Sequence, residues 1–302
     1  VAASADGVGT VSGIGANAAV NVSGGDGYSV ETDQEGEVTI QGAAYDVKGD
    51  DSVTYGVDST GAVNAIDDLD GTVSGNFDNP VSINGAEPLE ISGDEDGIVT
   101  VSATTADGIK EISGVSGSDV TIANAGGAES IGVAPASGED SMKVTFGEGT
   151  DAQEFEITED SDGVTFELTD AGKADGISGL GGKVAMDGTD SNFSINDTDL
   201  TISSGNEDIT ISTADGTISG VDGLTDAITG VPDGVTVGVA DSDVSINNGT
   251  YKIADTDNYT VTTGEPATVN GLNNGAKVES APAKYLLFSD TEILSFLPKI
   301  VD

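Results

Sequence analysis

The sequence predicts an all-β fold of tandem repeats, specifically an elongated β-solenoid or a closely stacked β-array. Three observations lead to this prediction. The apolar content is mostly Val, Ile and Ala, and Gly supplies 44 of 302 residues, about twice the usual ~7%. Apolar and polar residues alternate over short runs, as in half-buried strands. Related segments recur along the chain, which is typical of repeat architectures.

The recurrence is clearest between two segments far apart in the chain. Residues 38–66 match residues 244–272 without a gap, from V-T-I-Q in one copy and V-S-I-N in the other. A third copy begins at Phe193, and looser copies begin at Val81 and Val144. Matches of this length indicate a repeated structural unit.

A closing motif marks the end of each copy: a β-branched residue, then Ser, Thr or Asn, then usually Gly, then an aliphatic residue. Its copies are Val11–Ile14, Val63–Ile66, Ile112–Val115, Ile177–Leu180, Ile218–Val221 and Val269–Leu272. Their last residues lie between 41 (221 minus 180) and 65 (180 minus 115) positions apart. We therefore predict about five tandem β-repeats of roughly 50 residues over 1–280, followed by a different, apolar segment at 281–302.

Individual strands can be predicted within one repeat. Val244 and Ile246, then Tyr251 and Ile253, alternate with polar residues, and Asn248-Gly249 between them predicts a two-residue hairpin turn. This gives about four short strands per repeat, too few to bury an apolar face unless neighbouring repeats stack. A string of small β-sandwiches is the alternative fold, although about 50 residues is short for a sandwich of about 100.

The charge excludes several classes of partner. There are 54 acidic residues against nine Lys and no Arg, which gives a net charge of -45. Such a chain repels nucleic-acid phosphates and anionic lipid, and it attracts cations. The same charge also serves simple solubility. No run approaches the ~20 apolar residues that cross a bilayer, so we expect no membrane span.

The residue types argue against catalysis. The chain has no His, no Cys and no Arg, so it lacks the usual acid–base group near neutral pH, the thiol nucleophile and the bidentate anion binder. Phosphate-loop and S-x-x-K motifs are also absent. We predict that the protein is not an enzyme.

Calcium is the one ligand that the sequence suggests, and no other cofactor is expected. Hard cations prefer clustered oxygen donors, and paired aspartates recur at predicted turns. The candidate ligands are Asp94, Asp96, Asp160, Asp162, Asp241, Asp243, Asp255 and Asp257. The other interpretation, which stays open, is that these aspartates cap backbone amides of their own turns.

The last stretch differs from the rest because bulky apolar residues replace Gly and Asp. These residues are Tyr285, Leu286, Leu287, Phe288, Ile293, Leu294, Phe296, Leu297, Ile300 and Val301. One interpretation is a cap over the open end of the array, which repeat arrays need. The other is an assembly interface that docks on the next subunit and gives a head-to-tail polymer, since such heterologous contacts do not close.

Three segments carry a resemblance to a known class of protein. V-S-I-N-N-G-T-Y-K-I (244–253), D-N-Y-T-V (257–261) and V-N-G-L-N-N-G (269–275) resemble the β-strand-repeat surface proteins of bacteria, which serve as adhesins, coats or filaments. The resemblance covers most of the chain to about residue 280. It implies a secreted or cell-surface structural protein that self-associates, or alternatively an adhesin or stalk module that binds a glycan or host protein. It implies no catalytic residues.

Overall fold

The structure is a computed structural model, and its residues form two compact units, Val1–Gly182 (unit 1) and Lys183–Asp302 (unit 2). We describe each unit by itself. The structure describes residues 9–22, 27–50, 52–77, 79–93, 98–125, 127–134, 140–147, 149–159, 163–187, 191–203, 205–206, 208–240, 242–254, 258–265, 267–272, 277–279 and 287–288.

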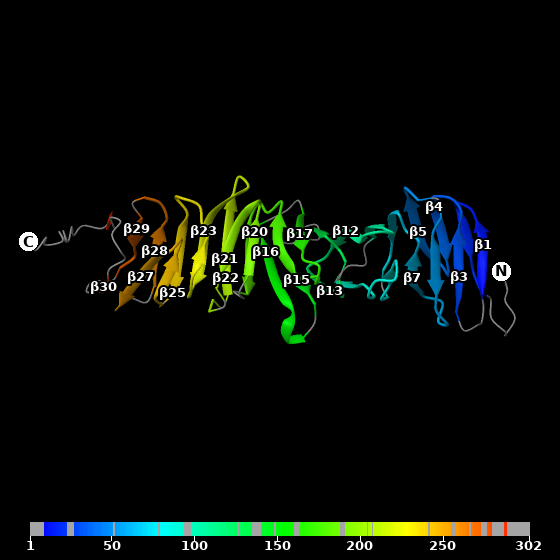
Figure 1. Cartoon of the computed structure of the whole chain (residues 1–302), viewed down its shortest axis with the longest axis horizontal. Coiled ribbons are helices and arrows are strands. Elements are labelled where there is room, and N and C mark those ends of the chain that lie inside the picture. Colours follow the sequence, from blue (N-terminus) through cyan, green and yellow to red (C-terminus); the bar gives the residue numbers. More distant parts are fainter. Residues whose placement is uncertain are drawn as a thin grey trace, which may run out of the picture. The chain divides into compact units, whose positions relative to one another are not determined.

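The prediction of an all-β solenoid is confirmed. Strands make up 62% of the chain, there is no α-helix among the described residues, and the sheets form a β-solenoid of about 11 turns counted over the two units. Within each unit the chain passes alternately through two walls of sheet, and successive passes lie side by side (Figure 1). We call these the first and second walls.

In unit 1 the first wall holds two sheets. One has the order β1 (Thr10–Ile14), β3 (Tyr28–Thr32), β6 (Thr54–Val57), β7 (Val63–Asp67) and β9 (Ser82–Ile83), and the other begins β10 (Glu90–Gly93), β13 (Asp119–Ala123), β15 (Ser141–Phe146) and β16 (Gln153–Thr158). The second wall has the order β2 (Ala18–Val20), β4 (Gly36–Ile40), β5 (Ala43–Lys48), β8 (Gly71–Gly75), β11 (Val99–Thr104), β12 (Gly108–Ser116), β14 (Ser130–Ala134), β17 (Val164–Leu168) and β18 (Ala174–Ser178). A 3-10 helix, Gly149–Asp151, lies between β15 and β16.

Unit 2 has the same two-walled construction. Its first wall has the order β19 (Lys183–Asp187), β22 (Asp208–Ala214), β23 (Thr217–Leu224), β25 (Thr236–Ala240), β28 (Asn258–Thr262), β29 (Thr268–Asn270) and β31 (Leu287–Phe288). Its second wall has the order β20 (Ser191–Ile195), β21 (Thr198–Ile202), β24 (Ile228–Thr229), β26 (Val244–Ile246), β27 (Gly249–Ala254) and β30 (Lys277–Glu279).

The order of hairpins and single strands explains the sequence repeat. In unit 2 the antiparallel hairpins β20–β21 and β22–β23 are followed by the single strands β24 and β25. The same order then recurs as hairpins β26–β27 and β28–β29 and single strands β30 and β31. One repeat here contains six strands rather than the predicted four, because two short single strands follow the two hairpins.

The hairpin turn of β26–β27 lies one residue earlier than predicted. Ile246 pairs with Gly249, so the two turn residues are Asn247 and Asn248, whose φ angles are 48° and 65°. Two positive φ values are typical of a type I′ turn, which asparagine tolerates almost as readily as glycine. The Asn-Gly pair that suggested the turn therefore straddles its end.

The closing motif is a β-bulge that turns two nearby side chains into the core. Its third residue has a positive φ, as at Gly114 (79°) and Gly271 (83°). Strict alternation would place positions one and four on opposite faces, and the additional left-handed residue brings both inward. Ile112 and Val115, for example, are 0% and 2% exposed.

Two predicted copies of the motif, Val63–Ile66 and Ile218–Val221, lack a left-handed third residue. Register irregularities still lie within both, and the first and last residues of each are buried. A further bulge follows three residues later in each case, Ile66–Leu69 and Val221–Leu224, where Asp68 (65°) and Gly223 (82°) are left-handed. These further bulges have Asp at the position where the motif has Ser, Thr or Asn, so the motif did not predict them.

Two asparagines link successive turns through side-chain hydrogen bonds to the backbone of a residue in the preceding turn. Asn84 accepts a hydrogen bond at Oδ1 from the N–H of Leu69 (2.9 Å) and donates from Nδ2 to its carbonyl (2.8 Å). Asn247 does the same with Val231, whose N–H lies 3.0 Å from Oδ1. Each asparagine follows an Ile at the end of an S-I strand segment. We call this contact the asparagine clip.

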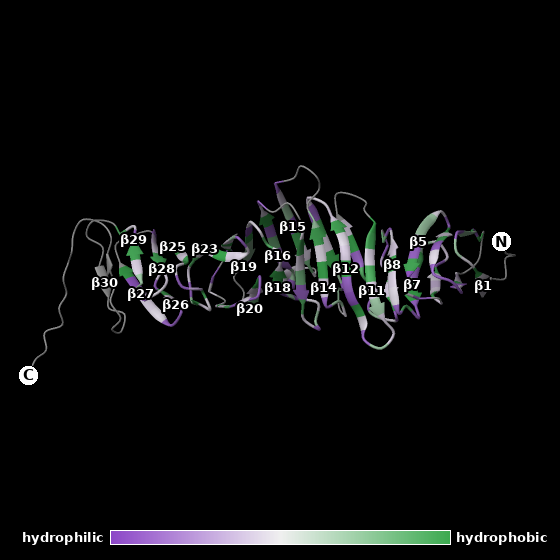
Figure 2. Cartoon of the chain, turned by 90° about the horizontal axis from the view of Figure 1, so that it is seen from above, coloured by the Kyte–Doolittle hydropathy of each residue, from purple (hydrophilic) through white to green (hydrophobic). Residues whose placement is uncertain are grey.

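The space between the walls is filled by the apolar side chains of alternate strand positions, such as Val99, Val101 and Ala103 of β11. In Figure 2 green, apolar residues accordingly alternate with white or purple ones along the strands. The bulkiest cluster is in unit 1, where the rings of Phe146, Phe155 and Phe166 have centroids 4.9 to 6.0 Å apart. Among the described large apolar residues, Ile98 alone is strongly exposed, at 71%. Within the described residues, the large apolar side chains are therefore mostly placed in the core.

Candidate assembly and ligand surfaces

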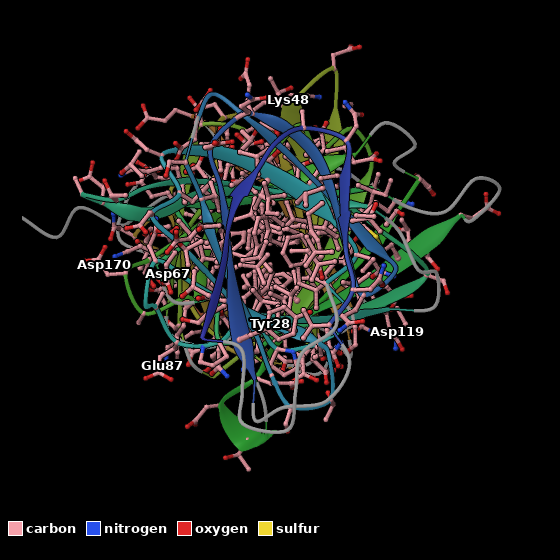
Figure 3. All side chains as sticks on the ribbon, turned by 90° about the vertical axis from the view of Figure 1, so that its right-hand side faces the viewer. Tyr28, Lys48, Asp67, Glu87, Asp119 and Asp170 are labelled. Carbon is pink, nitrogen blue, oxygen red and sulfur yellow. The ribbon has the colours of Figure 1, made fainter. Side chains whose placement is uncertain are left out.

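The charged side chains project outward from the walls. Viewed along the strand stack, carbon-rich side chains fill the centre, while Asp67, Glu87, Asp119 and Asp170 point away from it (Figure 3). Lys48 also points outward, and its Nζ lies 3.2 Å from Asp46 Oδ2. The negative charge is thus carried on the outer surface, where water and counterions reach it.

Of the eight predicted calcium ligands, Asp243 alone is in the described part of the chain. Its Oδ2 lies 3.6 Å from Lys252 Nζ, and both side chains are about half exposed. An exposed ion pair of this kind contributes little to stability. The other seven, Asp94, Asp96, Asp160, Asp162, Asp241, Asp255 and Asp257, lie outside the described residues.

The neighbourhood of Asp243 is polar but already paired. The Tyr259 hydroxyl lies 3.2 Å from the Ser242 carbonyl and 3.3 Å from the Tyr251 carbonyl, to which it donates. Burial, with the charge of Asp243 adding, raises the pKa of Tyr259 well above its ordinary value. The phenol therefore stays neutral and holds the turn in place.

Two described aspartates in turns bind their own backbone. Asp58 Oδ1 accepts from the N–H groups of Thr60 (2.8 Å) and Ala62 (3.0 Å) and from the Thr60 hydroxyl. The hydroxyl bond is the first cause that lowers the pKa of Asp58. Asp50 accepts from the N–H of Ser52 in its own turn and from the N–H of Asp70, 20 residues further along the chain. Asp50 and Asp58 are not among the eight candidate ligands, for which the amide-capping interpretation stays a prediction.

No group of three or more acidic side chains suited to a metal ion occurs within the residues that the structure describes. The calcium prediction therefore stays a prediction for the turns that lie outside them.

Part of the predicted assembly segment belongs to the first wall of unit 2. Leu287 and Phe288 form β31, which pairs in parallel with β29 through Thr268 and Val269. Among the described strands, β31 is the last in that wall, and β30, which pairs with β27, is the last in the second. The other predicted interface residues, Tyr285, Leu286, Ile293, Leu294, Phe296, Leu297, Ile300 and Val301, lie outside the described residues.

The walls also end in strands with one neighbour at the start of unit 1. Among described strands, β1 pairs with β3 alone and β2 with β4 alone, both in parallel. A strand with one neighbour presents backbone N–H and C=O groups on its other edge, which another chain can pair with. The sequence from Gly7 to Gly25 around these two strands contains no charged residue and no Pro, the usual protections of such an edge.

Comparison with known proteins gives no family model, no curated protein and no solved structure that matches this chain. Among the described residues we find no helix that is both long and apolar enough to traverse a lipid bilayer.

Proposed function

We propose that the protein is a non-catalytic, extracellular structural protein, a subunit of a cell-surface filament or coat that assembles head-to-tail. The observation that carries the proposal is that the C-terminal strand β31 extends the first wall of unit 2. β31 adds to β29 in parallel and in the plane of the first wall, so the chain lengthens the wall at that point. A further strand from another subunit would continue the same addition.

The distribution of charge supports end contacts over side contacts. The net charge is -45, and the labelled acidic side chains of Figure 3 point outward, so two subunits lying side by side repel each other at low salt. The region of β1 and β2 has no charge over residues 7–25, so a neighbour meets no such repulsion there. Contacts between unlike ends are heterologous and produce an open polymer.

An adhesin or stalk module that binds a glycan or host protein is the rival function. Carbohydrate sites commonly present an aromatic ring to solvent, and every Tyr and Phe whose side chain the structure describes is buried or half-buried. This distribution favours the scaffold over the glycan binder. A glycan array with one clear hit would reverse that preference.

Electron microscopy of the whole chain beside a chain truncated after Ala283 tests the proposal. Truncation there removes β31 and all the predicted interface residues. We expect filaments from the whole chain and monomers from the truncated one. Monomers in both samples would leave the segment as a cap and the subunit as a stalk or adhesin.

A further inference from the structure

The first wall of unit 1 is interrupted between β9 and β10. β9 ends one sheet and β10 begins the next. Across this gap a single bridge joins Val81 and Leu89, whose N–H groups each donate to the other's carbonyl at 2.9 and 2.8 Å. Pro80 and Pro88 precede the two bridge residues and have no N–H to donate. Beyond the bridge, β10 pairs with β13 alone among the described strands.

The direction of the unpaired groups follows from the ladder. In an antiparallel strand, successive residues direct their N–H and C=O to alternate sides. Leu89 directs both groups to Val81, so Glu90 and Ser92 face β13, while Ile91 and Gly93 face the open edge. β13 agrees with this assignment, because its Ile122 carbonyl accepts from Gly147 on the β15 side.

Apolar surface lies beside these groups. Ile91 is half-buried although it lies on the core side of β10 opposite the fully buried Ile122. A strand placed along the open edge would cover Ile91 while it pairs with two backbone positions.

The charge around the edge selects the partner. Residues 49–109 contain 13 acidic residues and no Lys. Glu87 and Glu90 are exposed on either side of Leu89, and Glu87 points away from the core (Figure 3). A second copy of this acidic chain is repelled from such a place, whereas a basic segment is attracted.

We propose that the open edge of β10 is a docking site for an extended, cationic segment of a partner protein. The segment pairs as a strand with the backbone of Ile91 and Gly93, packs alternate apolar side chains on Ile91, and places its Lys or Arg side chains near Glu87 and Glu90. This surface is separate from the ends that carry the proposed head-to-tail contact.

The probe is a capped hexapeptide of alternating lysine and valine, and its control is the same peptide with every amide N-methylated. Both carry the same charge, but the control cannot donate backbone hydrogen bonds. Loss of two net hydrogen bonds weakens binding about thirtyfold. We expect that difference in titration calorimetry, and slower hydrogen exchange at the Ile91 and Gly93 amides when the unmodified peptide binds. Equal affinity for both peptides would show general charge attraction and overturn the proposal.

Two substitutions locate the site. Ile91→Pro removes an N–H that faces the open edge and leaves the pairing of Glu90 and Ser92 with β13 intact, so we expect about fivefold weaker peptide binding. Glu90→Gln should weaken binding more than the matched Glu111→Gln, which removes one exposed charge from β12 on the second wall. Equal effects of the two Gln variants would refute binding at β10, and the exchange measurement on the unmodified protein decides the matter if Ile91→Pro does not fold.

Discussion

The asparagine clip makes a sharp prediction because Asn247 has a matched neighbour. Asn247 and Asn248 occupy the same turn, both are exposed, and both have positive φ. Asn247 makes two side-chain bonds to Val231, which is 3% exposed, whereas the structure shows no side-chain bond from Asn248. Replacing either by Gly keeps the backbone conformation accessible, so the difference between the variants isolates the clip.

The expected difference follows from the two bonds. A hydrogen bond contributes about 1 kcal/mol net, and an unpaired buried group costs somewhat more, so Asn247→Gly should lower the free energy of unfolding by about 2 kcal/mol. For a domain of this size that lowers Tm by about 4–8 °C. Asn248→Gly should change Tm by less than about 2 °C. Thermal unfolding followed by circular dichroism measures both, and faster exchange of the Val231 amide in Asn247→Gly locates the effect. Equal melting temperatures would refute the clip.

Four further outcomes follow from the structure. Gly223→Ala should destabilise the fold much more than Gly216→Ala, although both glycines have positive φ. A Cβ at Gly223 would lie 2.5 Å from the Asp208 carbonyl oxygen, whereas a Cβ at Gly216 meets nothing within 4 Å. Similar denaturant midpoints for the two variants would contradict this prediction. Tyr55→Phe should raise stability by about 1 kcal/mol or leave it unchanged, since the buried hydroxyl has no partner; a large loss in chemical denaturation would show a hidden bond. Burial raises the pKa of Tyr55 and Tyr259 above the usual 10.0, so the folded state holds these protons more tightly than the unfolded chain. Stability should therefore fall as the pH rises beyond about 10, and the phenolate absorbance of these two tyrosines should appear only on unfolding. Ionisation of all six tyrosines before unfolding would contradict this prediction. If turn aspartates bind calcium, Ca²⁺ at 100 times its Kd should add about 2.7 kcal/mol, and a Tm unaffected by chelator at low ionic strength would reject specific sites.

The sequence was sufficient to predict the fold class because residues that are adjacent in the sequence determine where each strand lies and which face it buries. Alternating Val, Ile and Thr positions specify strand faces, and the V-S-I-N segments mark strands in both walls, β9 in the first and β26 in the second. Val244, Ile246 and Val261 are buried as the alternation required. Short strands such as Ile228–Thr229 were harder to predict, since two residues carry no periodic signal.

The bulges and clips depend on pairing between turns, which the sequence does not display directly. Asp68 adopts a left-handed conformation at a position where the closing motif predicted no bulge, and aspartate tolerates that region. The clip had a visible signal, the Asn after S-I at positions 84 and 247, but its partner is set by the register of the neighbouring strand. The bonds to Leu69 and Val231 could not be assigned without that register.

The surfaces were predicted less completely than the fold. The absence of charge over residues 7–25 can be seen directly in the sequence. The open edge at β10 was not predicted, because it arises where the bridge between Val81 and Leu89 fails to continue past Pro80. Sequence indicates that a proline limits pairing, but not which neighbour is thereby lost.

The orientation of strands in an assembled filament tests the central proposal most directly. If subunits join by continuing the two walls, strands lie across the filament and stack along it at about 4.8 Å. Fibre diffraction from aligned filaments should then show a reflection at about 4.8 Å on the meridian. A reflection at that spacing on the equator, or aligned filaments that lack it, would mean that subunits associate through their sides or loops and would contradict head-to-tail assembly.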